Sequence, residues 1–220
     1  MKIAPDFCYN RIGLTIPRSA ALTAASHTYV FYERKIKMVY LFLAEGFEEI
    51  EALTPLDLLR RAGVKVTTVG VSGKTVRGAH GIEVAADVTT KDAAKLLSKE
   101  PIDMVILPGG MPGTLNLKAD PTVNRFIDAA YDGGKFLAAI CAAPSILGEK
   151  GILRGCEAIC FPGFEDSLAG AKLSGKSVVR DGNIITAKGM GVALDFGLML
   201  VSALCGDEKA ASLRASVQAG

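Results

Sequence analysis

The most informative part of the chain is Lys135–Gly148, KFLAAICAAPSILG, around which the rest of the sequence is organised. Its first part, Lys135–Ile140, is a short apolar run behind a Gly-Gly breaker, which predicts a buried parallel strand. A helix is predicted next, because Pro144 is tolerated in a first helical turn. Cys141 lies at the junction, on a sharp strand-to-helix turn. This arrangement is typical of a nucleophile elbow with a thiol in place of the usual hydroxyl.

Two interpretations of Cys141 follow from its position. The unpaired N–H groups and the positive end of the next helix favour a thiolate, so we expect a lowered pKa for this thiol. The neighbouring alanines would leave room for a ligand to approach the sulfur. The alternative is a buried structural cysteine, because free cysteines are often core residues. Position alone leaves both interpretations open.

The segments on both sides of this stretch alternate between strand and helix patterns. Alternation of this kind is typical of an α/β fold, a doubly wound and mostly parallel sheet with helices on both faces. We expect residues 38–220 to form one such domain, without an internal repeat. The main predicted strands and helices are Met38–Ala44, Glu48–Ala62, Val64–Val69, Asp103–Leu107, Pro121–Tyr131, Glu157–Phe161, Gly191–Leu204 and Asp207–Val217.

Composition excludes several classes of protein. The chain has 220 residues, half of them hydrophobic, and a net charge of +2 without a basic stripe, which argues against nucleic acid as the main partner. No apolar run is long enough to span a membrane. Five cysteines do not form a disulfide framework, and Cys156 and Cys160 with only two histidines make a poor zinc site. We therefore expect no metal and a reducing, cytoplasmic compartment.

Residues 1–37 differ from the rest of the chain. They mix Ser, Thr and Ala with scattered basic residues and show no sustained periodicity. One interpretation is an organelle transit peptide. The other, which we favour, is that Met38 is the natural start, so that the preceding residues are not native or are disordered. In either case we expect an extension outside the domain.

Ligands of parallel sheets bind beyond the carboxyl ends of the strands. There the loop Pro108–Gly113 could present the N–H of Gly110 as an oxyanion donor, or it could simply need a positive φ. Glu48, Glu49 and Glu51 begin the first helix, where acidic side chains are favourable. A carboxyl group turned toward the thiol would instead have a raised pKa and could donate a proton. The residues alone do not choose among the three.

Other catalytic groups are few. His80 is the only histidine after residue 37, so a cysteine–histidine hydrolase would have to use it. Gly189-Met190-Gly191 precedes a helix but lacks the third glycine and the acidic partner of a dinucleotide-binding fingerprint. We expect no organic cofactor.

Four segments together carry a resemblance: AEGFEEIEAL, LPGGMPG, AAICAAP and TAKGMGVALDFG, in this order. Over about residues 38–208 the chain resembles the ThiJ/PfpI family, whose superfamily includes the parkinsonism-associated protein deglycase and bacterial chaperone-deglycases. The thiazole-biosynthesis-named bacterial branch is the most similar. The resemblance implies a flavodoxin-like fold similar to class I glutamine amidotransferases, a homodimer, and a site without a cofactor.

The resemblance also implies roles for single residues. Cys141 matches the family's reactive cysteine, and Glu51 matches the glutamate whose protonated carboxyl group hydrogen-bonds the sulfur. Gly110 and Ala142 match the residues whose backbone N–H groups stabilise an oxyanion.

The chain departs from the family at three positions. Ala142 stands where the protease branch has a histidine, which argues against peptidase activity. Phe161 precedes Pro162 where some deglycases have a histidine, and His80 lies near the position of an entrance arginine in relatives. The candidates for the substrate pocket are His80, Gly109, Phe161 and Pro162.

Two functions follow from these residues. The first is a cysteine-dependent enzyme of the deglycase or glyoxalase type. It would act on reactive carbonyls, α-oxoaldehydes such as methylglyoxal or their early adducts on protein side chains. The second is a redox sensor or chaperone that protects against oxidative stress through the same cysteine, without turnover.

Overall fold

The computed structural model describes residues 7–9, 15–17 and 37–219, and the chain divides into two units after Lys35. In the first unit, β1 (Phe7–Tyr9) and β2 (Thr15–Pro17) form an antiparallel pair. The other residues before Lys37 lie outside the described residues, and so does the prediction of disorder made for them.

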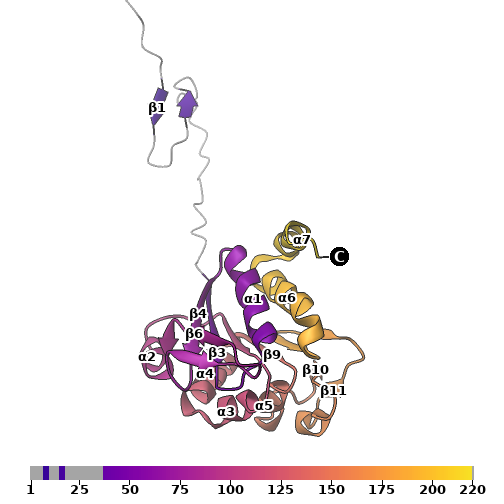
Figure 1. The fold of residues 1–220 in the computed structure, drawn as a ribbon. Coiled ribbons are helices and arrows are strands. Elements are labelled where there is room, and N and C mark those ends of the chain that lie inside the picture. Colours follow the sequence, from indigo (N-terminus) through magenta and orange to yellow (C-terminus); the bar gives the residue numbers. More distant parts are fainter. Residues whose placement is uncertain (1–6, 10–14, 18–36, 220) are drawn as a thin grey trace, which may run out of the picture. The chain divides into compact units, whose positions relative to one another are not determined.

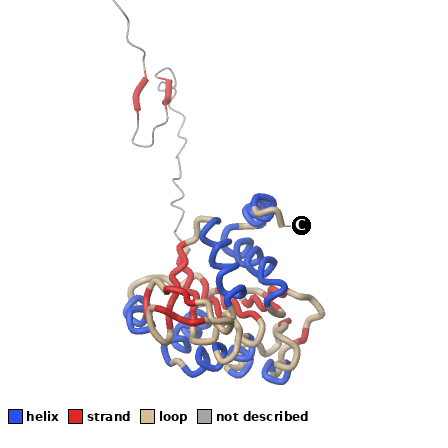
Figure 2. The backbone as a smooth tube through the Cα atoms, viewed as in Figure 1, coloured by secondary structure: helices blue, strands red, loops and turns tan. Residues whose placement is uncertain are grey.

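The second unit contains a seven-stranded sheet in the order β12-β13-β9-β8-β3-β4-β7. Figure 2 draws its strands in red among the blue helices. All neighbouring pairs are parallel except β12 and β13, which form an antiparallel hairpin at one edge. The chain adds strands on one side of β3 and then returns to add them on the other. The strands are β3 (Met38–Leu43), β4 (Lys65–Gly70), β7 (Val88–Thr89), β8 (Met104–Leu107), β9 (Phe136–Ile140), β12 (Val178–Asp181) and β13 (Ile184–Ala187).

Helices cover both faces of this sheet, as Figure 1 shows. One face carries α1 (Glu49–Arg61), α6 (Ala193–Cys205) and α7 (Asp207–Ser216). The other carries α2 (Thr90–Leu96), α3 (Gly113–Ala119), α4 (Pro121–Asp132) and α5 (Pro144–Glu149). The predicted flavodoxin-like, doubly wound α/β fold is thereby confirmed.

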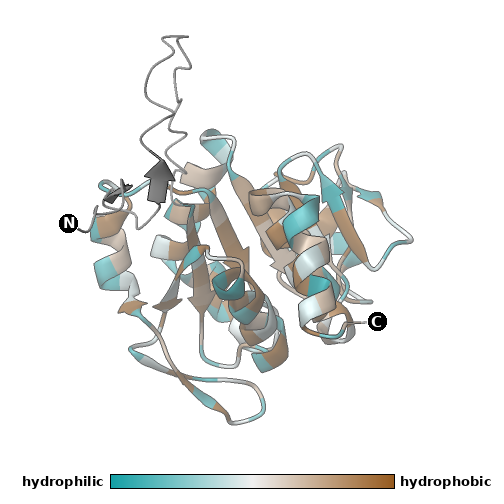
Figure 3. Ribbon diagram, turned by 90° about the horizontal axis from the view of Figure 1, so that it is seen from above, coloured by the Kyte–Doolittle hydropathy of each residue, from teal (hydrophilic) through white to brown (hydrophobic). Residues whose placement is uncertain are grey.

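The apolar runs of the central strands follow from burial on both faces. Along β3, Leu41 packs into the core under α1 and α6, whereas Tyr40 and Phe42 pack into the core under α4. In Figure 3 these strands are the most hydrophobic part of the second unit, and the helices carry polar residues on their outer sides. No helix in the described part of the chain has both the length and the apolar character that a membrane span needs.

One predicted element differs from the structure. The predicted strand Glu157–Phe161 is reduced to β10 (Glu157–Ala158), which pairs with β11 (Lys172–Leu173) outside the main sheet. Near residue 80 the chain forms a small antiparallel hairpin, β5 (Thr75–Arg77) with β6 (Glu83–Ala85). The turn of this hairpin contacts the segment just before α1, where Ala79 N–H donates to the Phe47 carbonyl oxygen.

Candidate active site

Cys141 occupies the sharp turn that its sequence predicts. Its φ is +65°, in the left-handed region that costs a non-glycine residue about 1–2 kcal/mol. The turn is held at both backbone groups: Cys141 N–H donates to the Ala187 carbonyl oxygen (2.9 Å), and Phe161 N–H donates to the Cys141 carbonyl oxygen (2.8 Å). A strained residue fixed in this way, at the end of a central strand, is typical of a functional site.

The helix after Cys141 begins later than expected. Residues 141–143 form a turn, and α5 starts at Pro144 and has only six residues. The thiol is therefore separated by one turn from a short helix, which weakens the expected effect of the helix dipole. Ala142 is buried in this turn, and its backbone N–H faces the sulfur together with that of Gly110.

Glu51 is the carboxyl group that faces Cys141. It lies in the first turn of α1 and is 1% exposed. Its Oε2 accepts a hydrogen bond from Gly109 N–H at 2.9 Å, whereas its Oε1 is buried and has no hydrogen-bond partner among the described residues. Glu48 caps the helix by accepting from Glu51 N–H at 2.7 Å, and Glu49 turns toward His80. The structure thus separates three glutamates that the residue pattern could not rank.

Gly109 allows this close approach. A Cβ atom on it would lie 2.6 Å from Cys141 Cβ and 2.7 Å from Glu51 Oε2. Any side chain would therefore separate the thiol from the carboxyl group. The next residue, Gly110, has φ +87°, and a Cβ there would meet the Glu48 backbone nitrogen at 2.4 Å. The loop thus needs glycine at position 109 for the close approach and at position 110 for the positive φ as well.

The pKa of Glu51 is raised to about 7. The main cause is burial, which removes water from the carboxylate, and the nearby charge of Glu48 adds to it. The Cys141 thiol and the backbone N–H groups of Gly109 and Met190 act in the opposite direction. Near neutral pH the carboxyl group can therefore either hold or release a proton.

The prediction of a lowered pKa for Cys141 is wrong for the free thiol. Burial raises its pKa to about 12, and the negative charge of Glu51 raises it further than the N–H groups of Gly110 and Ala142 can lower it. The two groups titrate as a pair, which we call the thiol–carboxyl pair, and between these pKa values they share one proton. A thiolate forms when Glu51 takes this proton, because its opposing charge then disappears.

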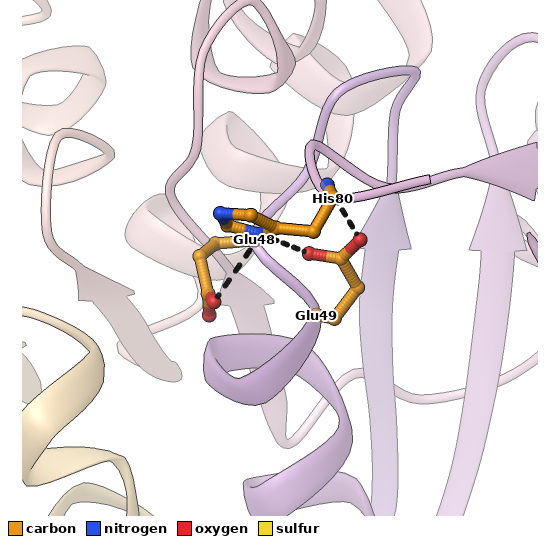
Figure 4. A group of neighbouring side chains, drawn as sticks. All are labelled: Glu48, Glu49 and His80. Carbon is orange, nitrogen blue, oxygen red and sulfur yellow. Dashed lines mark hydrogen bonds and ion pairs between the residues drawn. The ribbon is translucent and has the colours of Figure 1, made fainter. Parts of the chain in front are cut away.

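His80 lies on the hairpin and binds Glu49, as Figure 4 shows. Its Nδ1 is 2.9 Å from Glu49 Oε2 and 4.0 Å from Glu48 Oε1, and its side chain is 70% exposed. Hydrogen bonding to Glu49 raises the pKa of His80. In Glu49, burial raises the pKa, but the hydrogen bonds from His80 and Ile82 outweigh it, so that the pKa is lowered.

Within residues 37–219, His80 hydrogen-bonds Glu49 and not Cys141. These contacts do not support a histidine base at the sulfur. The ligand atoms of Glu48, Glu49 and His80 lie within 4.8 Å of one another. These side chains are the ones that could hold a metal ion, but the ion pair between His80 and Glu49 accounts for their arrangement.

Phe161 and Pro162 line a cavity together with residues 188–192. Met190 is a residue of the site that the sequence interpretation missed, since its backbone N–H lies close enough to Glu51 to lower the pKa of that carboxyl group. A Cβ on Gly189 would lie 3.9 Å from Glu51 Oε1. The segment Gly189-Met190-Gly191 could have been found because glycines before a helix often mark a close backbone approach. The sequence interpretation rejected it as a dinucleotide-binding fingerprint and otherwise used it only as part of the motif that carries the family resemblance.

Comparisons with known proteins identify relatives of this chain. The sequence profile described as the DJ-1/PfpI family matches residues 37–203. The zebrafish (Danio rerio) "Parkinson disease protein 7 homolog" is 37% identical over 81% of this chain and 95% of its own length. The Caenorhabditis elegans "Glutathione-independent glyoxalase DJR-1.2" is 34% identical over 77% of this chain and 89% of its own length.

Solved structures show the same fold. "Toxoplasma gondii DJ-1, oxidized" superimposes with a TM-score of 0.78 at 31% identity and covers 83% of this chain and 98% of its own. The family profile, the sequence identity and the fold agree over the part of the chain that contains Cys141 and Glu51. Relatives of this kind, one of them named a glyoxalase, support a DJ-1-type function. The chain belongs to the DJ-1/PfpI family.

Proposed function

We propose that this chain converts α-oxoaldehydes such as methylglyoxal into 2-hydroxy acids, with Cys141 as the nucleophile and Glu51 as the acid/base. The observation that carries the proposal is the thiol–carboxyl pair itself. A buried carboxyl group with a pKa near 7 lies beside the only thiol on a strained turn in the described chain, and one of its oxygens has no partner. A base near neutral pKa is well suited to proton transfer.

The reaction needs no external oxidant. Cys141 sulfur adds to the aldehyde carbon as Glu51 takes the thiol proton, and the oxyanion that forms lies near the N–H groups of Gly110 and Ala142. Glu51 returns the thiol proton to this oxyanion, which gives a hemithioacetal and frees the carboxylate again. The carboxylate then removes the former aldehyde hydrogen as a proton and delivers it to the neighbouring carbonyl carbon. This transfer oxidises the first carbon to a thioester and reduces the second to an alcohol. Water cleaves the thioester, which releases the 2-hydroxy acid and restores the thiol.

Lactate formation from methylglyoxal tests this proposal with the full chain. We expect repeated turnover in the wild type and its loss in Cys141→Ser and in Glu51→Gln. Cys156→Ser is the matched control, because Cys156 is also a partly buried free cysteine but lies outside the site. Consumption of only one equivalent of methylglyoxal by the wild type, or full activity in Cys141→Ser, would refute the proposed enzymatic function.

A redox function is the second candidate, and a specific observation favours it. Cys141 is a partly accessible thiol, and a structure similar to this chain is described as oxidized. A thiolate at this position could be oxidised to a sulfinate, to which protonated Glu51 would donate a hydrogen bond. Stoichiometric peroxide consumption by Cys141, without aldehyde turnover, would support this function over the first. Early protein adducts of methylglyoxal are further substrates to test in the same assay.

We also propose that the chain is a homodimer. Ile50 on α1 and Leu194 on α6 are exposed apolar side chains (46% and 37%) on two helices that lie side by side (Figure 1). Large exposed apolar side chains on neighbouring elements are typical of an interface. Sedimentation equilibrium of the wild type should give twice the chain mass, and the double substitution of Ile50 and Leu194 by Lys should reduce it to one.

A further inference from the structure

A cavity of about 370 Å³ lies close to Glu51, because Gly189 lines it and a Cβ on Gly189 would lie 3.9 Å from Glu51 Oε1. It is lined by Phe161, Pro162, Lys188 and residues 189–192. This volume is within the range of small-molecule sites, roughly 300–1,000 Å³. The cavity could therefore hold the part of a substrate that does not react.

Two residues that line the cavity, Phe161 and Met190, lie close to Cys141 and Glu51. Phe161 N–H donates to the Cys141 carbonyl oxygen at 2.8 Å, so the backbone that carries the phenyl group is held beside that of Cys141. Met190 follows Gly189, where a Cβ would lie 3.3 Å from the Phe161 ring and 3.9 Å from Glu51 Oε1. The unpartnered Oε1 of Glu51 is thus close to the floor of the cavity.

The walls are apolar, apart from Lys188. Phe161 is 47% exposed and Met190 is 53% exposed, although both are large hydrophobic residues. Such exposure beside a buried carboxyl group is what a bound apolar group would cover. Met190 has a flexible, polarisable side chain that packs well against aromatic rings. The chemistry of the cavity therefore suits a flat apolar substituent better than a single methyl group.

We propose that this cavity binds the substituent of the α-oxoaldehyde and makes the chain prefer arylglyoxals, such as phenylglyoxal, to methylglyoxal. The inference rests on the proposed function and deepens it by naming the substrate class. The aldehyde carbon lies at Cys141, and the adjacent carbonyl group lies near Glu51. The aryl ring then packs between Phe161 and Met190. The reaction is the one described above, with water as the co-reactant and mandelate as the product.

The test compares kcat/KM for phenylglyoxal and for methylglyoxal, each corrected for the background of Cys141→Ser. In the wild type we expect phenylglyoxal to be favoured by about tenfold or more, since a few buried apolar groups change specificity by this order. Met190→Ala should reduce that ratio about fivefold or more, and Met190→Leu, which keeps the apolar volume, should largely preserve it.

Leu173→Ala is the control, because Leu173 is equally exposed (55%) but lies on β11, away from the cavity. It should leave both rates unchanged. Turnover of methylglyoxal with a wild-type ratio near one, or equal effects of Met190→Ala on both substrates, would overturn this inference and leave the proposed function intact. Turnover of neither substrate would overturn both.

Discussion

Replacing Glu51 by Gln should change how the stability of the protein depends on pH. The pKa of Glu51 is raised by burial from 4.5 to about 7, so between these values the folded protein keeps a proton that the unfolded chain has released. Stability therefore falls as the pH rises through this window. The difference between these two pKa values corresponds to about 3 kcal/mol of stability. Gln is uncharged and can keep the hydrogen bond from Gly109.

The assay is urea unfolding of both proteins between about pH 5 and 6.5. The free energy of unfolding of the wild type should fall in this interval by about 2 kcal/mol more than that of Glu51→Gln. Asp92→Asn is the control. Hydrogen bonds from Lys95 and Thr89 lower the pKa of Asp92, so its carboxylate is ionised in both folded and unfolded chains in this interval. If wild type and Glu51→Gln change in parallel, the burial argument for the thiol–carboxyl pair is wrong.

The remaining predictions concern the turn, the loop and the hairpin around the site. Gly109→Ala should lower kcat/KM at least tenfold and destabilise the protein by about 1–3 kcal/mol, because its Cβ would meet two site atoms within 3 Å. Gly175→Ala, where nothing lies within 4 Å, should do neither. Cys141→Gly should be more stable than Cys141→Ala by about 1 kcal/mol in urea unfolding, since only glycine relieves φ +65°. Equal stability of the two would contradict the strained turn. His80→Ala should leave kcat/KM for methylglyoxal within about twofold of wild type, because its ring binds Glu49; a much larger loss would place the histidine in the reaction. Finally, kcat/KM should rise with pH through about 7, as the thiol–carboxyl pair loses its first proton, and a flat profile would exclude Glu51 as the base.

Sequence patterns alone were sufficient to predict the fold class and the sharp turn that carries Cys141. Strands buried on both faces need apolar residues at every position. A run such as Met38–Leu43 could therefore be predicted to be a buried strand before any contact was known. The turn at Cys141 could be predicted because the Gly-Gly pair, the apolar strand and Pro144 follow one another along the chain. The short run after Glu157 was misread as a strand of five residues, since short apolar runs do not distinguish strands from loops that fill a core.

The electrostatic environment of Cys141 could be established only from the folded chain. Which of three neighbouring glutamates faces the sulfur depends on how α1 is rotated against the sheet, and Glu51 was singled out before only by resemblance. The direction of the Cys141 pKa depends on burial and on a carboxyl group 90 residues away, so a local argument from the helix gave the wrong sign. Met190 comes close to Glu51 only because the segment after β13 crosses the end of the sheet. Local patterns report backbone conformation, whereas electrostatics and access are set by residues that meet only when the chain has folded.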